Sequence, residues 1–341
     1  MTVYSQTQVN SRIFSDTEGP VMGDDINGLH HVGHIVQDMN QAMERYRRLG
    51  FTVPAPAYPV LPRVPGGPAE PFGVANTHVY FPRNFIELVA VIDNTGRMPG
   101  EARPVPLQAP DDKLPGLRAA IRATAATITS LLQRFQGLHI VLADTPDIDG
   151  VAARLTAADV GHGGVHAIQR PVETSTGTKM EPARYLEISH PHLPAGRVPE
   201  GRIGFAENTP VEALEDERHT DHPNGATGLV ECVLCVADSA LPELEHRYGT
   251  YFGQARDGRV TRFDRANITI VAASALAGLL PGERPAALPA FVAYTVSVRD
   301  IAATERLLRD NDIPVTHTGT GEMFVPANAA LGAAIIFRQD D

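Results

Sequence analysis

One pattern recurs four times along the sequence and restricts the folds that the chain can adopt. In each copy an apolar strand ends at an acidic residue, an amphipathic helix of about a dozen residues follows, and short strands separated by Gly and Pro come next. The first strands of the four copies read LHHVGHIVQD, GLHIVLADTPD, GLVECVLCVAD and FVAYTVSVRD. We interpret each copy as a βαβββ module.

A single module of this kind leaves one face of its sheet uncovered, so modules are expected to pair. Four modules make two paired domains. The predicted fold class is α+β, with open, U-shaped sheets whose concave side can hold a ligand. We predict a flexible N-terminal tail over residues 1–25, a first domain over 26–221 from modules one and two, and a second domain over 222–341 from modules three and four.

Two connecting segments interrupt the repeat. The Pro-rich stretch over residues 54–71 is too rigid and too poor in N–H donors for a central strand, so it is predicted to be a loop. Residues 114–135 carry apolar side chains at helical spacing and are predicted to form a helix that joins modules one and two. Both connectors are expected to face solvent, and covering a cavity is the alternative for either of them.

The charge of the chain argues against two classes of partner. The formal net charge is −11 and the pI is near 5.6, which leaves no basic stripe for nucleic acid or an anionic membrane. The sequence has no continuous apolar run of about 18 residues, and its first residues show neither a basic leader nor an apolar core. We expect a cytoplasmic protein that acts on a small-molecule substrate.

The two cysteines, Cys232 and Cys235 in ECVLCVAD, have the spacing of a redox pair. Redox pairs need a turn that opens a helix, whereas this pair lies inside an apolar strand pattern. Residues three apart on a strand point to opposite faces of the sheet, so these cysteines can share neither a disulfide nor a metal. We interpret them as packing residues.

Histidines occupy similar places on the first strands of modules one and two. His31 lies seven residues before Asp38, and His139 lies eight residues before Asp147, where the two helices are expected to begin. His30 and His34 have the opposite strand parity to His31 and are interpreted as hydrogen-bonded core or rim residues.

Glutamates occupy similar places on the last strands of the same modules. Glu87 lies in FIELVAV and Glu207 in IGFAEN, and a carboxylate inside a strand is costly unless it is paired or bound to a cation. Glu187 in RYLEISHP is an alternative to Glu207, but it falls on the third strand of its module. Two imidazoles and two carboxylates suit a borderline divalent ion such as Zn, Ni, Co, Mn or Fe(II). The predicted ligands of one ion in the first domain are His31, Glu87, His139 and Glu207.

The third strand of module one supplies candidate substrate-binding residues. In NTHVYF one set of side chains alternates with another. If Thr77, Val79 and Phe81 pack on the helix, the alternate side chains face the cleft and can orient a substrate. Ordinary packing against the neighbouring strands is the alternative. The candidate substrate-binding residues are Asn76, His78 and Tyr80.

Modules three and four lack this set. Glu231 lies seven residues before Asp238, but the counterpart of Glu87 is about Thr269. In module four the matching positions are Ala293 and an apolar run around Ile335. We therefore predict a degenerate second domain that serves as a scaffold, forms a homodimer or closes the cleft.

The segments HHVGHIVQDMNQAMERYRRLGF and FIELVAV resemble the vicinal oxygen chelate superfamily, which includes glyoxalase I, methylmalonyl-CoA epimerase, extradiol dioxygenases and bleomycin-resistance proteins. GLHIVLADTPDIDGVAARL, PEGRIGFAENTP and HPNGA are similar to a glyoxalase-like branch of it. The resemblance extends from about residue 26 over nearly the whole chain. It implies that the predicted ligands fall on the metal-ligand positions of the family. Module two departs from the pattern by a turn one residue longer and an extended hairpin, HPHLPAGRVPEG.

A divalent ion with open positions can chelate two neighbouring oxygen atoms of a substrate and stabilise an enolate-like intermediate. A carboxylate then moves the proton, and Glu207, or secondarily Glu87, is the candidate. These residues predict a metalloenzyme of the isomerase, epimerase or lyase type. Two alternatives stay open: an Fe(II)-dependent ring-cleaving dioxygenase that uses three of the four ligands, and a metal-free protein that sequesters an aromatic or drug-like ligand.

Overall fold

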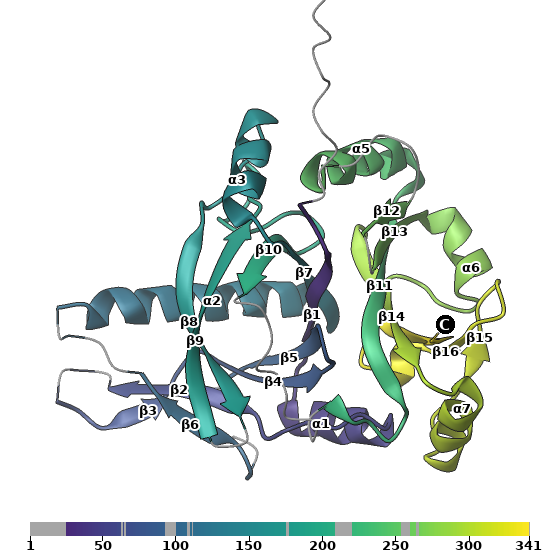
Figure 1. Cartoon of the computed structure of the whole chain (residues 1–341), viewed down its shortest axis with the longest axis horizontal. Helices are drawn as coiled ribbons and strands as arrows, with labels where there is room; N and C mark the ends of the chain where they lie inside the picture. The colour runs from purple at the N-terminus through teal and green to yellow at the C-terminus, as the bar shows by residue number, and fades with distance from the viewer. Residues whose placement is uncertain are drawn as a thin grey trace, which may run out of the picture.

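The computed structural model describes residues 25–62, 64, 66–92, 100–107, 110, 112–174, 177–208, 220–253, 260–263 and 266–340. The predicted tail over residues 1–25 therefore lies outside the described residues, except for its last residue. An N-terminal half, purple to teal, lies beside a C-terminal half, green to yellow (Figure 1). Helices and an open, mixed sheet confirm the predicted α+β class.

The first strand of each N-terminal module lies at the centre of the sheet. The strands of this half are β1 (Gly28–Ile35), β2 (Ala57–Pro62), β3 (Ala69–Pro71), β4 (Val74–Tyr80), β5 (Phe85–Val91), β6 (Arg103–Pro106), β7 (Gly137–Asp144), β8 (His166–Thr174), β9 (Gly177–Glu187) and β10 (Arg202–Asn208). Its helices are α1 (Met39–Arg48), α2 (Leu114–Arg134) and α3 (Ile148–Ala157). β1 runs antiparallel to β7, and each pairs in parallel with the last strand of its own module, β5 or β10.

The C-terminal half repeats this arrangement. Its elements are β11 (Ala226–Val236), η1 (Asp238–Ala240), α5 (Leu241–Tyr251), β12 (Val260–Arg262), β13 (Asn267–Ala272), η2 (Ala273–Ala275), α6 (Leu276–Leu279), β14 (Ala290–Val298), α7 (Ile301–Asp310), β15 (Thr316–His317), β16 (Met323–Val325), η3 (Ala327–Ala329) and β17 (Ala334–Gln339). β11 runs antiparallel to β14, and they pair in parallel with β13 and β17. In the described part, α5 is followed by two paired strands, one fewer than a full module has.

The acidic residue that ends the first strand has a structural role in three of the four copies. Asp38 accepts a hydrogen bond from the backbone N–H of Gln41, and Asp147 accepts one from Gly150. Asp300 caps α7 in the same way. A carboxylate at this position satisfies N–H groups that a helix leaves unpaired in its first turn. The repeated acid therefore fixes the point at which each of these helices begins.

One hydrophobic core runs through both halves. The buried face of α1, with Met39, Ala42, Met43 and Tyr46, packs in the same cluster as α3, α5 and strands of the C-terminal half. β7 and β14 also meet in the sheet, at Leu138 and Phe291. The predicted division into domains stays a prediction, since the two halves share their core.

A buried chain of hydrogen bonds crosses between the halves. The hydroxyl of Tyr46 lies 2.9 Å from Nδ1 of His34 and 2.7 Å from the hydroxyl of Tyr294, while Nε2 of His34 lies 2.8 Å from the carbonyl oxygen of Leu331. This confirms that His34 is a hydrogen-bonded core residue. Buried polar groups that are fully paired in this way favour one relative position of the elements that carry them.

The Pro-rich segment is not wholly a loop. β2 and β3 lie within residues 54–71 and pair with each other, and β2 meets β4 only at Ala57. β2 also pairs in parallel with β6 from Ala57 to Val60, so it has neighbours on both sides. Proline lacks an N–H donor but its carbonyl oxygen can still accept, as that of Pro59 does from the N–H of Phe72. The prediction of a loop is therefore wrong for these two short strands.

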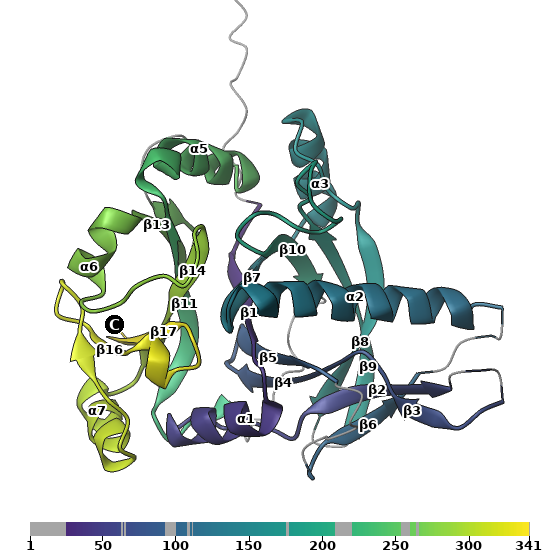
Figure 2. The ribbon, with the colours of Figure 1, turned by 180° about the vertical axis from the view of Figure 1, so that it is seen from behind.

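The connecting helix α2 forms as predicted, but it does not simply face solvent. Its side chains Ile128 and Leu131 are buried against Ile35, Val89 and Ile140 of the central strands. Figure 2 shows α2 lying across the sheet, on the face opposite the core that contains α1 and α3. An apolar patch on this face needs a cover, and α2 removes it from water.

The two cysteines are free and buried on opposite faces of β11, as predicted. Cys232 belongs to the large core, whereas Cys235 packs with α6 in a separate cluster. In the part of the chain that the structure describes, no helix is both long and apolar enough to cross a membrane.

Acidification is expected to destabilise the fold. Burial lowers the pKa of His34 to about 4, against the effect of the Leu331 carbonyl, and burial also lowers the pKa of His139 to about 4. In the unfolded chain these histidines bind protons from about pH 6.5 downward. The free energy of unfolding should therefore be highest above about pH 6.5 and fall towards pH 4. Denaturant titrations across this range measure the loss.

His34→Gln should lower the free energy of unfolding at neutral pH, because the hydrogen bonds to Tyr46 and Leu331 are disturbed. It should also reduce the loss of this free energy on acidification, because one buried histidine is removed. His246→Gln, at an exposed position on α5, is the matched control. An undiminished fall in His34→Gln would contradict this account of the acid sensitivity.

Candidate functional site

The face of the N-terminal sheet that α2 partly covers, here called the cleft face, carries a group of polar side chains. On β4 the alternate residues Ala75, Thr77 and Val79 are buried against the core. The intervening side chains are half-buried and lie on the opposite face of the strand, where the sequence predicts the ligand cleft. The predicted substrate-binding residues Asn76, His78 and Tyr80 therefore share one face of β4.

Glu87 lies on the cleft face of β5, in register with Gly33 of β1 and His78 of β4. The side-chain amide of Asn76 donates a hydrogen bond to its Oε1 at 2.9 Å. Burial raises the pKa of the Glu87 carboxyl, while the bond from Asn76 and the charge of Arg202 act in the opposite direction. Glu87 is thus a carboxyl group that takes up a proton more readily than an exposed one.

His31 lies on the same face of the neighbouring strand. Its ring stacks on Phe85, with the ring centroids 4.6 Å apart, and its Nδ1 lies 2.7 Å from Nδ1 of His30. Burial lowers the pKa of His31 well below its ordinary value, and His30, His78 and Arg202 lower it further. His31 is therefore neutral near pH 7.

His30 does not point away from His31, contrary to the expectation from strand parity. The register of β1 on β7 shifts between Leu29 and His31, which makes His30 the extra residue of a β-bulge. Both imidazoles contact the ring of Phe85 as a result.

Arg202 of β10 brings a positive charge to the cleft face. Its Nε donates a hydrogen bond to Oε1 of Glu187 at 2.7 Å, so the alternative ligand Glu187 is the partner of a guanidinium. Arg202 affects the pKa of both His31 and Glu87, which places its charge within reach of both groups. Arg202 is not among the site residues predicted from the sequence. The signal that could have found it is its strand parity, which differs from that of the core residues Ile203 and Phe205.

His139 does not join His31. It is the extra residue of a bulge between Leu138 and Ile140, and its Nε2 lies 2.9 Å from the carbonyl oxygen of Phe135. Burial lowers the pKa of His139, and the neighbouring groups Arg134, His34 and Arg197 lower it further. The structural counterpart of His139 in module one is thus the bulged His30, not His31.

Glu207 lies on the opposite face of the sheet from Glu87. Its Oε2 accepts hydrogen bonds from the backbone N–H of Ile148, at the start of α3, and from Arg184. The neighbours Ile203 and Phe205, two and four residues earlier on β10, belong to the core that contains α3. Glu207 therefore stabilises a helix N-terminus rather than lining the cleft.

The residues that do correspond to His31 and Glu87 in module two are Ile140 and Gly204. Ile140 lies seven residues before the helix cap Asp147, as His31 lies seven before Asp38. Glu87 is in register with Gly33, and the matching pair in module two is Gly204 with Leu142. A Cβ at Gly204 would collide with the carbonyl oxygen of Leu186, so that position has no room for a carboxylate.

The predicted four-ligand centre is therefore not formed. Two of its members, His31 and Glu87, share the cleft face, and the other two lie elsewhere. Among the described residues, no three His, Cys, Asp or Glu side chains are grouped as metal ligands. The side chains present do not fit the divalent ion that the resemblance implied.

In the described part of the C-terminal half, the positions that correspond to the His31 and Glu87 positions hold other side chains. Glu231 is in the position of His31, but it bonds to Thr269 and to Arg338, whose Nη2 lies 2.7 Å from Oε2. Ala293 and Ile336 pack in an apolar cluster with α6. The predicted role of this half in dimerisation stays a prediction.

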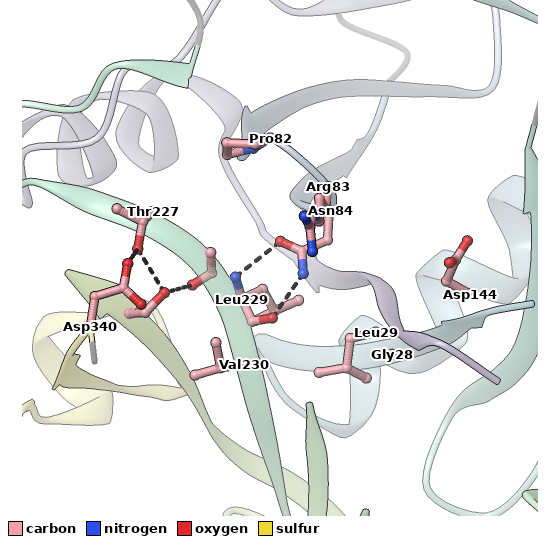
Figure 3. Close-up of a pocket in the computed structure, with 12 residues that line it drawn as sticks. Gly28, Leu29, Pro82, Arg83, Asn84, Asp144, Thr227, Leu229, Val230 and Asp340 are labelled. Carbon is pink, nitrogen blue, oxygen red and sulfur yellow. Dashed lines mark hydrogen bonds between the residues drawn. The ribbon is translucent and has the colours of Figure 1, made fainter. Parts of the chain in front are cut away.

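A separate cavity of about 350 Å³ lies where the two halves meet (Figure 3). The side-chain amide of Asn84 exchanges two hydrogen bonds with the backbone of Leu229 in its wall, and Thr227 bonds to Asp340. The Asn84 contacts join the turn before β5 to β11, and the Thr227 contact joins β11 to the residue after β17. The polar residues of the cleft face do not line this cavity.

Paired modules, with first and last strands at the sheet centre and polar side chains on the open face, define the vicinal oxygen chelate class of fold. The chain belongs to the glyoxalase-like domain family, whose model matches residues 29–252. This confirms the resemblance seen in the sequence. A comparison with curated proteins gives no match.

Solved structures share the fold at low sequence identity. A hypothetical protein from Staphylococcus aureus aligns with a TM-score of 0.54 and 13% identity, over 92% of this chain and 100% of that chain. A triple mutant of 4-hydroxymandelate synthase from Streptomyces coelicolor aligns with a TM-score of 0.52 and 12% identity, over 92% of this chain and 93% of that chain. At this identity the likeness concerns the fold alone.

The full chain, purified without a tag, is expected to hold well under one equivalent of Zn, Ni, Co, Mn or Fe after dialysis against each ion, because the donor set is incomplete. Elemental analysis checks this. His31→Ala and His139→Ala should show the same low content as the wild type. One equivalent of metal in the wild type that both variants lose would restore the four-ligand interpretation.

Proposed function

We propose that the cleft of the N-terminal half binds a small oxygenated molecule and transfers a proton to or from it, with Glu87 as the acid–base group. The observation that carries the proposal is the burial of the Glu87 carboxyl on this face, held by the side-chain amide of Asn76: burial raises its pKa, and the hydrogen bond from Asn76 opposes this only in part. A group that ionises closer to neutral pH exchanges protons with carbon acids more effectively than an ordinary carboxylate.

Two neighbours support this role. His31 is held neutral and its ring is fixed by stacking on Phe85 and by the Nδ1 contact with His30, so its Nε2 is the nitrogen that could orient a carbonyl or hydroxyl group. Arg202, fixed by Glu187, supplies positive potential where an enolate-like oxygen would develop. The reaction type is that of an isomerase, epimerase or lyase.

His78 and Tyr80 complete one wall of the cleft. The hydroxyl of Tyr80 lies 3.0 Å from Nδ1 of His78, and the ring of His78 lies against Phe85. We assign these two side chains to substrate orientation and Asn76 to holding Glu87. No step is assigned to a metal ion, because Ile140 and Gly204 replace its ligands in module two.

A ligand-sequestering protein is the second candidate. The observation that favours it is the position of α2, which covers part of the cleft face with Ile128 and Leu131. Such a protein would bind its ligand without converting it. Loss of the Glu87 carboxylate would then change the affinity for the ligand, and there would be no reaction rate to change.

Exchange of α-protons in D2O, followed by proton NMR on a panel of 2-oxo acids and 2-hydroxy ketones, tests the proposed reaction. The wild type should exchange one class of these compounds faster than buffer, and Glu87→Gln should slow this by about 100-fold or more. Glu207→Gln is the matched control and should stay within a few-fold of the wild type, because its amide oxygen can still accept from Ile148.

The exchange rate should fall on acidification with an apparent pKa above that of an ordinary glutamate. Glu87 must be ionised to act as a base, and burial raises its pKa. Exchange that survives in Glu87→Gln but fails in Glu207→Gln would contradict the proposal. Absence of exchange across the panel would favour the sequestering protein.

A further inference from the structure

Three arginines gather beside the cleft, where the end of α2, the segment before β10 and the start of β7 meet. They are Arg134 on α2, Arg197 in the 189–201 segment and Arg202 on β10. Arg197 contacts Ser130, one helical turn before Arg134 on α2, and the bridge between Val198 and Gly201 brings the segment of Arg197 next to Arg202. Consistent with this placement, Arg134 and Arg202 lower the pKa of Arg197 beyond the effect of burial.

Two of these guanidinium groups have strong acceptors. Arg202 is bonded to the carboxylate of Glu187, and Arg134 donates to the backbone carbonyl oxygens of Glu200 and Pro289 at 3.3 and 2.7 Å. The carboxylate of Glu200 is itself bonded to Arg247 of α5 at 2.7 Å. It therefore already neutralises another cation.

Arg197 differs from its neighbours. It is 8% exposed, and NH1 donates to the hydroxyl of Ser130 on α2 at 2.7 Å. Within the described residues, its Nε has no hydrogen-bond partner and no carboxylate lies within ion-pair distance of its guanidinium. A buried guanidinium without an anion, beside two other cations, is unfavourable unless something compensates it.

A second orphaned atom lies in the same region. Nδ1 of His139 is buried and has no partner in the described part of the chain, and Arg197 and Arg134 are among the charges that lower the pKa of His139. A neutral imidazole whose Nε2 donates to the carbonyl of Phe135 keeps Nδ1 as an acceptor, so this nitrogen needs a donor such as water or the hydroxyl of a protonated phosphate. Buried polar atoms without protein partners call for a ligand or water.

We propose that the guanidinium of Arg197, held in place by the hydroxyl of Ser130, forms a binding site for the carboxylate or phosphate group of a small anion. A planar guanidinium with a free Nε recognises such oxyanions through paired hydrogen bonds. The site lies at the border of the cleft through Arg202, so the anionic group of a substrate or a free inorganic anion can occupy it. The proposal stands whether or not the cleft transfers a proton.

Isothermal titration of the full chain with inorganic phosphate and with oxalate, in buffer free of other oxyanions, tests the site. The wild type should bind at least one of them at millimolar or lower concentration, and Arg197→Gln should weaken that binding tenfold or more. Arg309→Gln, on the exposed surface of α7 in an ion pair with Glu305, is the matched control and should bind as the wild type does.

Competition distinguishes the two sources of the anion. Displacement of phosphate by pyruvate assigns the site to a substrate carboxylate, and phosphate binding that pyruvate leaves unchanged assigns it to an inorganic anion; either result supports the site. The absence of binding by both probes, or equal binding in Arg197→Gln, would overturn it.

Arg197→Met separates an anion site from a structural role. Without added anion its melting temperature should match or exceed that of the wild type, because a buried unpaired charge is removed. Saturating phosphate or oxalate should raise the melting temperature of the wild type by about 4 °C but leave that of Arg197→Met unchanged. A variant that melts far below the wild type without anion would assign Arg197 to structure and overturn the proposal.

Discussion

The alternation of side chains along the paired central strands β1 and β7 decides which residues of the N-terminal half can act together. Each strand carries one bulge, at His30 and at His139, in equivalent positions about the axis between them. These bulges keep Val32 and Val141 in the core while His31 and Ile140 turn to the cleft. A shift by one residue would exchange the two faces of a strand.

The two modules that form this cleft are similar in backbone and different in chemistry. Module one provides His31 and Glu87, whereas module two provides Ile140, Gly204 and the paired Arg202. A fixed guanidinium therefore stands near His31 and Glu87, and α2 covers part of this face. The C-terminal half contributes support: its Tyr294 completes the buried chain with Tyr46 and His34.

Much of the fold could be predicted from local pattern. The repeated strand and helix, the capping acids Asp38 and Asp147, and the opposite faces of Cys232 and Cys235 all follow from the periods of helices and strands. The alternation of NTHVYF also places Asn76 on the face that carries Glu87. These features depend only on residues that are close in sequence.

The features that the sequence did not predict depend on strand register and tertiary packing. Counting back from Asp147 by eight rather than seven residues selected the bulged His139 in place of Ile140, and strand parity set Glu207 against α3. The position of α2 follows from an apolar patch built by four separate strands, which no single segment reveals. The incomplete hydrogen bonding of Arg197 depends on tertiary contacts, so the sequence does not indicate it.

A crystal structure of the full chain grown with Mn or Zn, with the ion located by anomalous scattering, measures the central claim directly. The account predicts His31 and Glu87 on the cleft face opposite Ile140 and Gly204, with Glu207 at the start of α3. An ion held jointly by His31, Glu87, His139 and Glu207 would contradict it.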